Sequence, residues 1–200
     1  MELKRVVVTG LGAITPLGNN VSDYWNALLN GVSGSARITH FDPSKFKTQF
    51  ACEIKNFKIE DHFDRKEGRK LDPYSHYGIV SAQQAFTDSG LDKEKINLDR
   101  CGVIWGSGIG GLETFQMEVS GFAKGDGTPR FNPFFIPKMI ADICAGHISI
   151  QYNFRGPNFT TCSACASSTN AMIDSFNYIR LGKADVFITG GSEAAVNESG

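Results

Sequence analysis

Three short runs of hydrophobic residues mark the chain, and each run ends in glycine. They span residues 6–10, 103–106 and 186–191. Unbroken runs rich in β-branched residues are typical of strands that are buried on both faces, as in a mostly parallel sheet. A fourth, less apolar strand is predicted from Asn158 to Cys162.

Helix signals fill the intervals between these runs. Asp72 can cap a helix that has Pro73 at its first position and Gly90 after its end. Further helices are predicted from a Ser22 cap to Asn30, from Pro137 through Ile148, and from Ala166 to Leu181. Strands that alternate with helices predict an α/β fold with right-handed crossovers. Residues 33–71 and 112–136 depart from this alternation, and the second segment is expected to be rich in loops.

The composition is that of a folded protein. The 200 residues are enough for one large domain or two small ones. Hydrophobic residues make up 41% and charged residues 20% of the chain, which excludes a disordered protein. The net charge of −1 argues against general nucleic-acid binding. No apolar run reaches the roughly 18 residues of a membrane-spanning helix, and the first residues lack a signal-peptide pattern, so a cytoplasmic protein is expected.

A glycine-rich segment follows the second strand. Gly106-Ser-Gly-Ile-Gly-Gly111 fits the G-x-G-x-x-G pattern of dinucleotide sites, which also need an acidic residue about 20 positions further on. Asp126 lies near that distance, but among glycines in a predicted loop. A tight glycine turn at the wall of an active site is therefore favoured over a dinucleotide site.

The five cysteines do not form a disulfide framework, because their number is odd and their spacing is not paired. Cys162 and Cys165 match C-x-x-C, which leaves a redox pair or half of a metal site open. No other Cys or His pair has ligand spacing, so no metal is expected. The remaining cysteines, Cys52, Cys101 and Cys144, are expected in the core.

Cys165 lies where a polar strand turns into a helix, among small residues. The free N–H groups of a helix N-terminus stabilise a thiolate, and small neighbours allow a sharp turn like a nucleophile elbow. The backbone N–H of Cys165 could also serve as an oxyanion donor. This local chemistry leaves a nucleophile and an inert buried cysteine equally open. His147 could act as its base, although helical spacing favours a core histidine.

A basic run, Arg65-Lys-Glu-Gly-Arg-Lys70, carries four basic residues and one acid. Such runs are usually solvated surface. In a chain with a net charge of −1, it also fits a docking patch for an acidic partner.

These motifs, in their order along the chain, resemble the β-ketoacyl-acyl-carrier-protein synthases, the elongating condensing enzymes of bacterial fatty acid synthesis. The matching segments are residues 6–18, 65–72, 106–112, 132–137, 145–147, 155–157, 163–167 and 190–193. The Gly-Ile-Gly-Gly and Pro-Phe-Phe-Ile-Pro stretches are more similar to the type II synthases than to type I.

The resemblance implies a thiolase-like fold of α-β-α-β-α layers, of which residues 1–200 supply most of the N-terminal half. It implies that Cys165 takes an acyl chain from acyl-carrier protein as a thioester. Malonyl-carrier protein then loses CO2, and its carbanion attacks the thioester to give a β-ketoacyl chain. No organic cofactor is expected, because the phosphopantetheine arrives on the carrier protein.

The resemblance also assigns roles to further residues. Ile109 matches the position that gates the acyl pocket. Phe134 and Phe135 match the pocket wall near the interface of a homodimer. The three residues that match the basic patch for acyl-carrier protein are Lys66, Arg69 and Lys70.

The family's catalytic histidines and lysine would follow Gly200. A chain that ends there is therefore expected to fold poorly and to be inactive in condensation. Two alternatives stay open. One is a non-catalytic partner subunit, against which the retained Cys165 argues. The other is an acyltransferase or thiolase relative, which would not depend on malonyl substrate.

Overall fold

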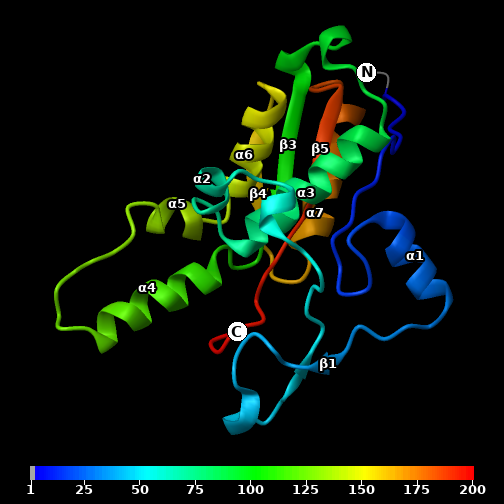
Figure 1. Cartoon of the computed structure of the whole chain (residues 1–200). Helices are drawn as coiled ribbons and strands as arrows, with labels where there is room; N and C mark the ends of the chain where they lie inside the picture. Colours follow the sequence, from blue (N-terminus) through cyan, green and yellow to red (C-terminus); the bar gives the residue numbers. More distant parts are fainter. Residues whose placement is uncertain (1–2) are drawn as a thin grey trace.

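The computed structural model describes residues 3–200 and is built around a parallel three-stranded sheet (Figure 1). Strand β3 (Cys101–Gly106) lies in the centre, between β4 (Asn158–Thr161) and β5 (Val186–Gly191). Both neighbours run parallel to β3, and the register pairs Gly106 with Thr161 on one side and with Gly191 on the other. The carboxyl ends of all three strands therefore meet at one edge of the sheet.

Helices cover both faces of this sheet. Helices α3 (Pro73–Asp88) and α6 (Ile143–Tyr152) pack on each other and contact β5 and β3. Helix α7 (Ser167–Arg180) contacts all three strands. The result is an α-β-α arrangement, which is three of the five layers expected for a thiolase-like fold.

Strand β3 is buried along its whole length, as its apolar sequence predicts. The side chains of Val103 and Trp105 join the core cluster with residues of α3 and α6. The opposite face meets α7 so closely that a Cβ on Gly106 would lie 2.4 Å from the backbone carbon of Ser167. Burial on both faces explains why this strand shows no alternation of polar and apolar residues.

Asp72 forms a buried junction between two helices. Its carboxylate caps α3 by accepting a hydrogen bond from the Tyr74 N–H, 3.2 Å away. The other carboxylate oxygen accepts hydrogen bonds from the N–H and Oγ1 of Thr114, at 2.9 and 2.7 Å. Thr114 lies in the first turn of α4 (Leu112–Lys124), so one side chain satisfies unpaired N–H groups of two helix N-termini.

The strand predicted at residues 6–10 is wrong. Within residues 3–200 this segment pairs with no strand, and Val8 is 80% exposed. It runs along α3 instead, where the Leu11 N–H donates to Asp88 and the Ala13 N–H donates to Gln84. A run of β-branched residues specifies an extended backbone, whereas pairing also requires a strand edge beside it.

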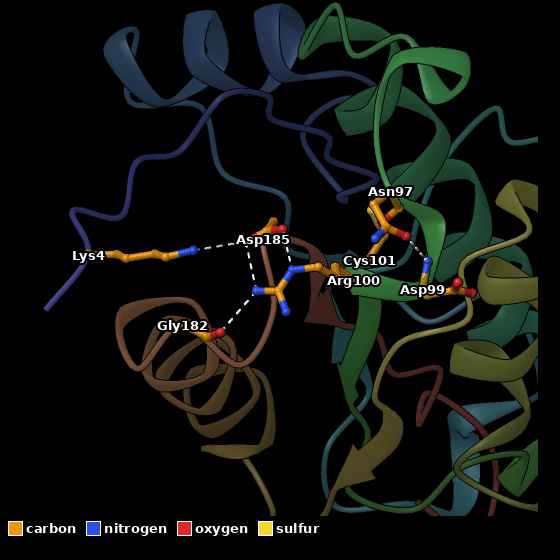
Figure 2. A network of polar contacts seen from close by, with 7 residues as sticks. All are labelled: Lys4, Asn97, Asp99, Arg100, Cys101, Gly182 and Asp185. Carbon is orange, nitrogen blue, oxygen red and sulfur yellow. Dashed lines mark hydrogen bonds and ion pairs between the residues drawn. The ribbon is translucent and has the colours of Figure 1, made fainter. Parts of the chain in front are cut away.

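The N-terminal segment is attached to the amino ends of β3 and β5 by a charged network (Figure 2). Lys4 Nζ lies 3.1 Å from Asp185 Oδ1, and the Arg100 guanidinium donates to the same carboxylate. A further guanidinium hydrogen bond, 2.9 Å long, reaches the carbonyl of Gly182. The hydrogen bond from Arg100, and then that from Lys4, lowers the pKa of Asp185 to about 2 against the opposing effect of burial.

The remaining elements are short, with one exception. The first helix, α1 (Val21–Leu29), is capped by Asn20 rather than by the predicted Ser22. Residues 112–124, which were expected to be loop, form α4, and the predicted helix from Pro137 is two helices, α5 (Phe135–Met139) and α6. The others are β1 (Ala36–Arg37), η1 (Pro43–Lys45), β2 (Phe50–Ala51), η2 (Ile59–Asp61), α2 (Arg65–Gly68), η3 (Lys93–Lys95) and η4 (Leu98–Arg100). Within residues 3–200, no helix has the length and hydrophobicity needed to cross a bilayer.

Candidate active site

A cavity of about 500 Å³ opens where the carboxyl ends of the three strands meet. The loop after each strand contributes to its wall. The lining residues are 106–109 after β3, Ala164, Cys165, Ser167 and Ser168 after β4, and 191–193 with Ala195 after β5. In open parallel sheets, ligands bind outside the carboxyl ends of the strands, so this cavity is the candidate site.

Cys165 lies on a sharp turn between β4 and α7. The residue before it, Ala164, has a φ of 50°, which is a left-handed conformation that non-glycine residues rarely adopt. Ser167 is buried and holds the turn, because its Oγ accepts from the Ser163 N–H at 2.9 Å and donates to the Ala164 carbonyl at 2.7 Å. The predicted elbow-like turn is confirmed, and it leaves Cys165 exposed in the cavity wall.

Two features of Cys165 suit nucleophilic chemistry. Cys165 lies two positions before the first residue of α7, beside a helix N-terminus that has no side-chain cap, and such a terminus stabilises a thiolate. Its own backbone N–H donates to no acceptor within residues 3–200. An N–H that is free in the resting state is available to an oxyanion.

The other cysteines have different surroundings. Cys162 is exposed, and its thiol donates to the Gly108 carbonyl at 3.3 Å, so it contacts the glycine-rich loop. Cys101 and Cys144 are buried, as predicted. The prediction of a core position for Cys52 is wrong, because this side chain is exposed.

The glycine-rich segment forms a tight loop between β3 and α4. Gly110 has a φ of 78°, and a Cβ there would lie 2.5 Å from the Met139 carbonyl. At Gly111, a Cβ would lie 2.4 Å from the Lys138 carbonyl. Close packing against α5 therefore accounts for these glycines, in agreement with the predicted tight turn. Ile109 is 54% exposed on this loop and lines the same cavity as Cys165.

Phe134 and Phe135 do not line this cavity in the described part of the chain. The Phe135 ring stacks on Phe131, with centroids 5.6 Å apart, and lies 6.4 Å from Phe115. Phe134 lies instead beside the basic run, where Lys70 Nζ is 5.8 Å from its ring centroid. Their role in a pocket wall stays a prediction.

The basic run forms α2 and the residues just after it. Lys66 and Arg69 are exposed, while Lys70 forms an ion pair with Glu67, at 2.6 Å, in addition to its contact with Phe134. Two predicted features, the basic patch and Phe134, are thus adjacent in space although they are more than sixty residues apart in sequence.

His147 lies away from Cys165. It is half-buried on α6 and is not part of the cavity wall. Burial lowers its pKa, with an opposing effect from Glu67 and a further lowering by Lys70. These charged neighbours place the ring beside the basic run, so a role as base for Cys165 is not supported.

The sequence interpretation missed Glu193, which projects from the loop after β5. Its carboxylate oxygen Oε2 accepts from the Gly108 N–H at 2.7 Å. It also lines both the main cavity and a smaller one of about 70 Å³, whose wall includes His40 and Glu113. Its position two residues after the end of a predicted strand was the available signal, because residues at the carboxyl ends of parallel strands line ligand sites.

The chain matches a family model over residues 3–200, that of the β-ketoacyl synthase N-terminal domain. The chain belongs to the β-ketoacyl synthase family. Among curated relatives, the 3-oxoacyl-[acyl-carrier-protein] synthase 2 of Staphylococcus aureus (strain COL) is 44% identical over 193 residues, which are 96% of this chain and 46% of that protein. The chain thus spans about half the length of the curated relatives it matches.

Solved structures place this β-ketoacyl synthase domain in the thiolase-like fold. One is a type II polyketide synthase acyl-carrier protein in complex with its ketosynthase, with a TM-score of 0.83, 26% identity, and coverage of 98% of this chain and 52% of that chain. Another is a β-ketoacyl synthase from Burkholderia phymatum, with a TM-score of 0.77, 27% identity, and coverage of 91% and 45%. The thiolase-like prediction is confirmed.

Proposed function

We propose that this domain supplies the acyl-accepting site of a β-ketoacyl-acyl-carrier-protein synthase and that Cys165 is its nucleophile. The observation that carries the proposal is the position of Cys165 on a strained turn before α7, in the wall of a cavity that also contains Ile109. A thiol that is exposed at a helix N-terminus is suited to attack on a thioester.

In the first step, the Cys165 sulfur attacks the acyl thioester on the carrier protein's phosphopantetheine. A new carbon–sulfur bond forms, the pantetheine sulfur leaves, and the proton lost by Cys165 ends on that sulfur. The free N–H of Cys165 can donate to the oxyanion while the tetrahedral intermediate exists. No resident cofactor is needed, since the pantetheine belongs to the incoming substrate.

In the second step, malonyl-carrier protein loses CO2, and its carbanion attacks the Cys165 thioester. A carbon–carbon bond forms, and the thiolate of Cys165 is released as the leaving group. We assign this condensation to a synthase of the relatives' full length that carries the present chain as its N-terminal part. Covalent catalysis of this kind divides one difficult reaction into two easier steps.

We assign the docking of acyl-carrier protein to Lys66, Arg69 and Lys70. The first two of these side chains are exposed, and carrier proteins are acidic, so the charges are complementary. A carrier protein in complex with its ketosynthase is also among the solved structures similar to this chain.

We further propose that the synthase is a cytoplasmic homodimer. The segment from α4 to α5 exposes Phe122, Phe131 and Phe134, each by more than 40%. Aromatic side chains are enriched in the buried parts of protein interfaces, which supports a second copy of the chain as the partner of this surface.

The proposal is tested by labelling with an acyl thioester or a cerulenin-type electrophile, followed by peptide mapping. We expect label on Cys165 and none on Cys162 or Cys52, which are the stringent controls because they too are exposed. Cys165→Ala should abolish labelling, whereas Cys162→Ala should retain it. Label on Cys162, or equal label on all exposed cysteines, would contradict the proposal, and a protein that takes no label at Cys165 would fit a non-catalytic partner subunit.

A further inference from the structure

Glu193 bridges two of the strand ends that form the cavity. It follows β5, yet its carboxylate oxygen Oε2 accepts from the N–H groups of both Gly108, at 2.7 Å, and Ile109, at 3.3 Å, in the loop after β3. The second oxygen lies 3.5 Å from Ser107 Oγ. One side chain therefore contacts three successive residues of the loop that carries Ile109.

The loop has few other attachments on this side. The Gly110 N–H donates to Ser107 Oγ at 3.0 Å, which is a contact within the loop itself. From the β4 side, the Ser107 N–H donates to the Thr161 carbonyl at 3.2 Å, and the Cys162 thiol, which is a weak donor, reaches the Gly108 carbonyl. Hydrogen bonds to a carboxylate are shorter and stronger than those between neutral groups, so Glu193 supplies the strongest contact between the loop and another strand.

Gly108 allows this contact to be close. A Cβ at that position would lie 3.0 Å from Glu193 Oε2, and 3.5 Å from the backbone of Ala164 on the nucleophile turn. The carboxylate therefore packs directly on the loop backbone, and the loop in turn packs on the segment that carries Cys165. A shift of the loop would move Ile109 relative to the nucleophile.

We propose that Glu193 is a positioning residue that holds the loop 107–110 over the cavity and thereby sets how easily an acyl chain can displace Ile109 on its way to Cys165. The proposal deepens the proposed function and rests on it. A long acyl chain must fill more of the cavity than a short one, so the restraint on Ile109 should matter most for long substrates.

The first measurement follows acylation of Cys165 by a short and a long acyl thioester, in a full-length synthase that carries this chain. In Glu193→Ala we expect the rate ratio of long to short substrate to rise by about three- to tenfold, the effect of losing hydrogen bonds to an exposed charged group. Glu193→Gln keeps one acceptor oxygen and should give a smaller rise. The matched control is Glu198→Gln, which neutralises an exposed carboxylate of the same segment that does not touch the loop.

A double-mutant cycle tests whether the effect passes through Ile109. In an Ile109→Ala background, Glu193→Ala should leave the ratio unchanged, because the side chain that the loop positions is absent. An undiminished effect in that background would overturn the proposal. So would an equal loss of rate with both substrates in Glu193→Ala, which is the result expected of general damage to the fold.

Amide hydrogen exchange gives a readout that does not depend on activity. The N–H groups of Gly108 and Ile109 should exchange faster in Glu193→Ala than in the parent, while those of β3 should not change. Unchanged exchange at Gly108 and Ile109 would overturn the role of Glu193. A parent protein that is not acylated at Cys165 would instead overturn the proposed function, so the two failures can be told apart.

Discussion

The cavity end of the sheet differs from the arm that runs from α4 to α5. The cavity end packs small residues closely, whereas the arm exposes large hydrophobic ones. At the cavity end, Gly106 and Ser167 are buried, and hydrogen bonds join the loop after β3 to the loops after β4 and β5. The arm, residues 112–139, extends away from the body of the molecule (Figure 1). Its Phe115, Met117 and Phe122 are between 43% and 65% exposed.

The aromatic rings of the arm contact mainly one another. Phe131 lies between Phe122 and Phe135, at centroid distances of 5.4 and 5.6 Å. Such pairs contribute about 0.5–1.5 kcal/mol beyond the area they bury, which is much less than full burial in a core. The difference teaches that small residues pack closely around a fixed site in one region, whereas the aromatic residues of the other region stay exposed.

The largest expected effect comes from two isoleucines of the same helix, α6. Ile148 is fully buried and Ile150 is 77% exposed. Ile148→Ala should lower the free energy of unfolding by about 2–5 kcal/mol, because it removes buried methyl groups and leaves a cavity. Ile150→Ala should change it by less than about 0.5 kcal/mol. Denaturant titration measures both, and similar losses would show that the exposed face of α6 is covered by other parts of the protein.

Replacing one glycine in each region by alanine compares how closely the two regions are packed. Gly106→Ala forces a Cβ to within 2.4 Å of the backbone at the start of α7 and should destabilise the fold by about 1–3 kcal/mol. Gly121 lies inside α4 and has no atom within 4 Å of a Cβ, so Gly121→Ala should stabilise the protein by about 0.5–1 kcal/mol through helix propensity. Thermal unfolding gives the sign of the stability change for each variant. A loss of stability in Gly121→Ala would mean that this face of the arm packs against another part of the protein or a second chain.

The basic patch lies beside the arm, since Lys70 contacts the Phe134 ring. Reversing the charges of Lys66, Arg69 and Lys70 should raise the KM for carrier-protein substrate by about tenfold or more, because the electrostatic attraction is lost. The KM for a small thioester should change little. Reversal of Lys93 and Lys95, which are exposed on η3, is the control. An equal change in the KM for both substrates would show that the patch is ordinary solvated surface and not a docking site.

The smallest effect is expected at the amino ends of the strands. Arg100, and then Lys4, lowers the pKa of Asp185 to about 2. A carboxyl group whose pKa is lowered by folding stabilises the protein above its ordinary pKa near 4, and this contribution is lost as the pH falls towards 2. The Asp185 side chain is 44% exposed, so Asp185→Asn should cost under about 1 kcal/mol at neutral pH.

The check is the acid dependence of unfolding. In Asp185→Asn, the free energy of unfolding should fall less steeply between pH 4 and pH 2 than in the parent. The difference at neutral pH should also shrink in high salt. A loss well above about 1 kcal/mol would mean that the amino ends of the strands are held as firmly as the carboxyl ends.

The elements that depend on local chemistry could be predicted from sequence. The apolar run at 103–106 predicted the strand that is observed at 101–106, and Asp72, Pro73 and Gly90 predicted α3. The residues at 6–10 carry the same kind of pattern but join no strand within residues 3–200, and the residues that follow them contact α3. Local sequence specifies the extended backbone, whereas the pairing partner is a tertiary property.

The candidate site divides in the same way. The turn around Cys165 could be predicted, because its small residues and the helix after it are neighbours in sequence. The hydrogen bond from Gly108 to Glu193 joins residues 85 positions apart. Only the register that pairs Gly106 with Gly191 brings the two loops together, and no local pattern encodes that register.

The left-handed backbone of Ala164 limits which residues can precede the nucleophile during sequence drift. An L-residue pays roughly 1–2 kcal/mol to hold this conformation, and the Ala164 backbone also lies close to the neighbouring loop, 3.5 Å from a Cβ built on Gly108. Glycine, alanine and asparagine are the tolerable choices. Position 164 should therefore accept few substitutions, and a saturation library there should retain few functional members.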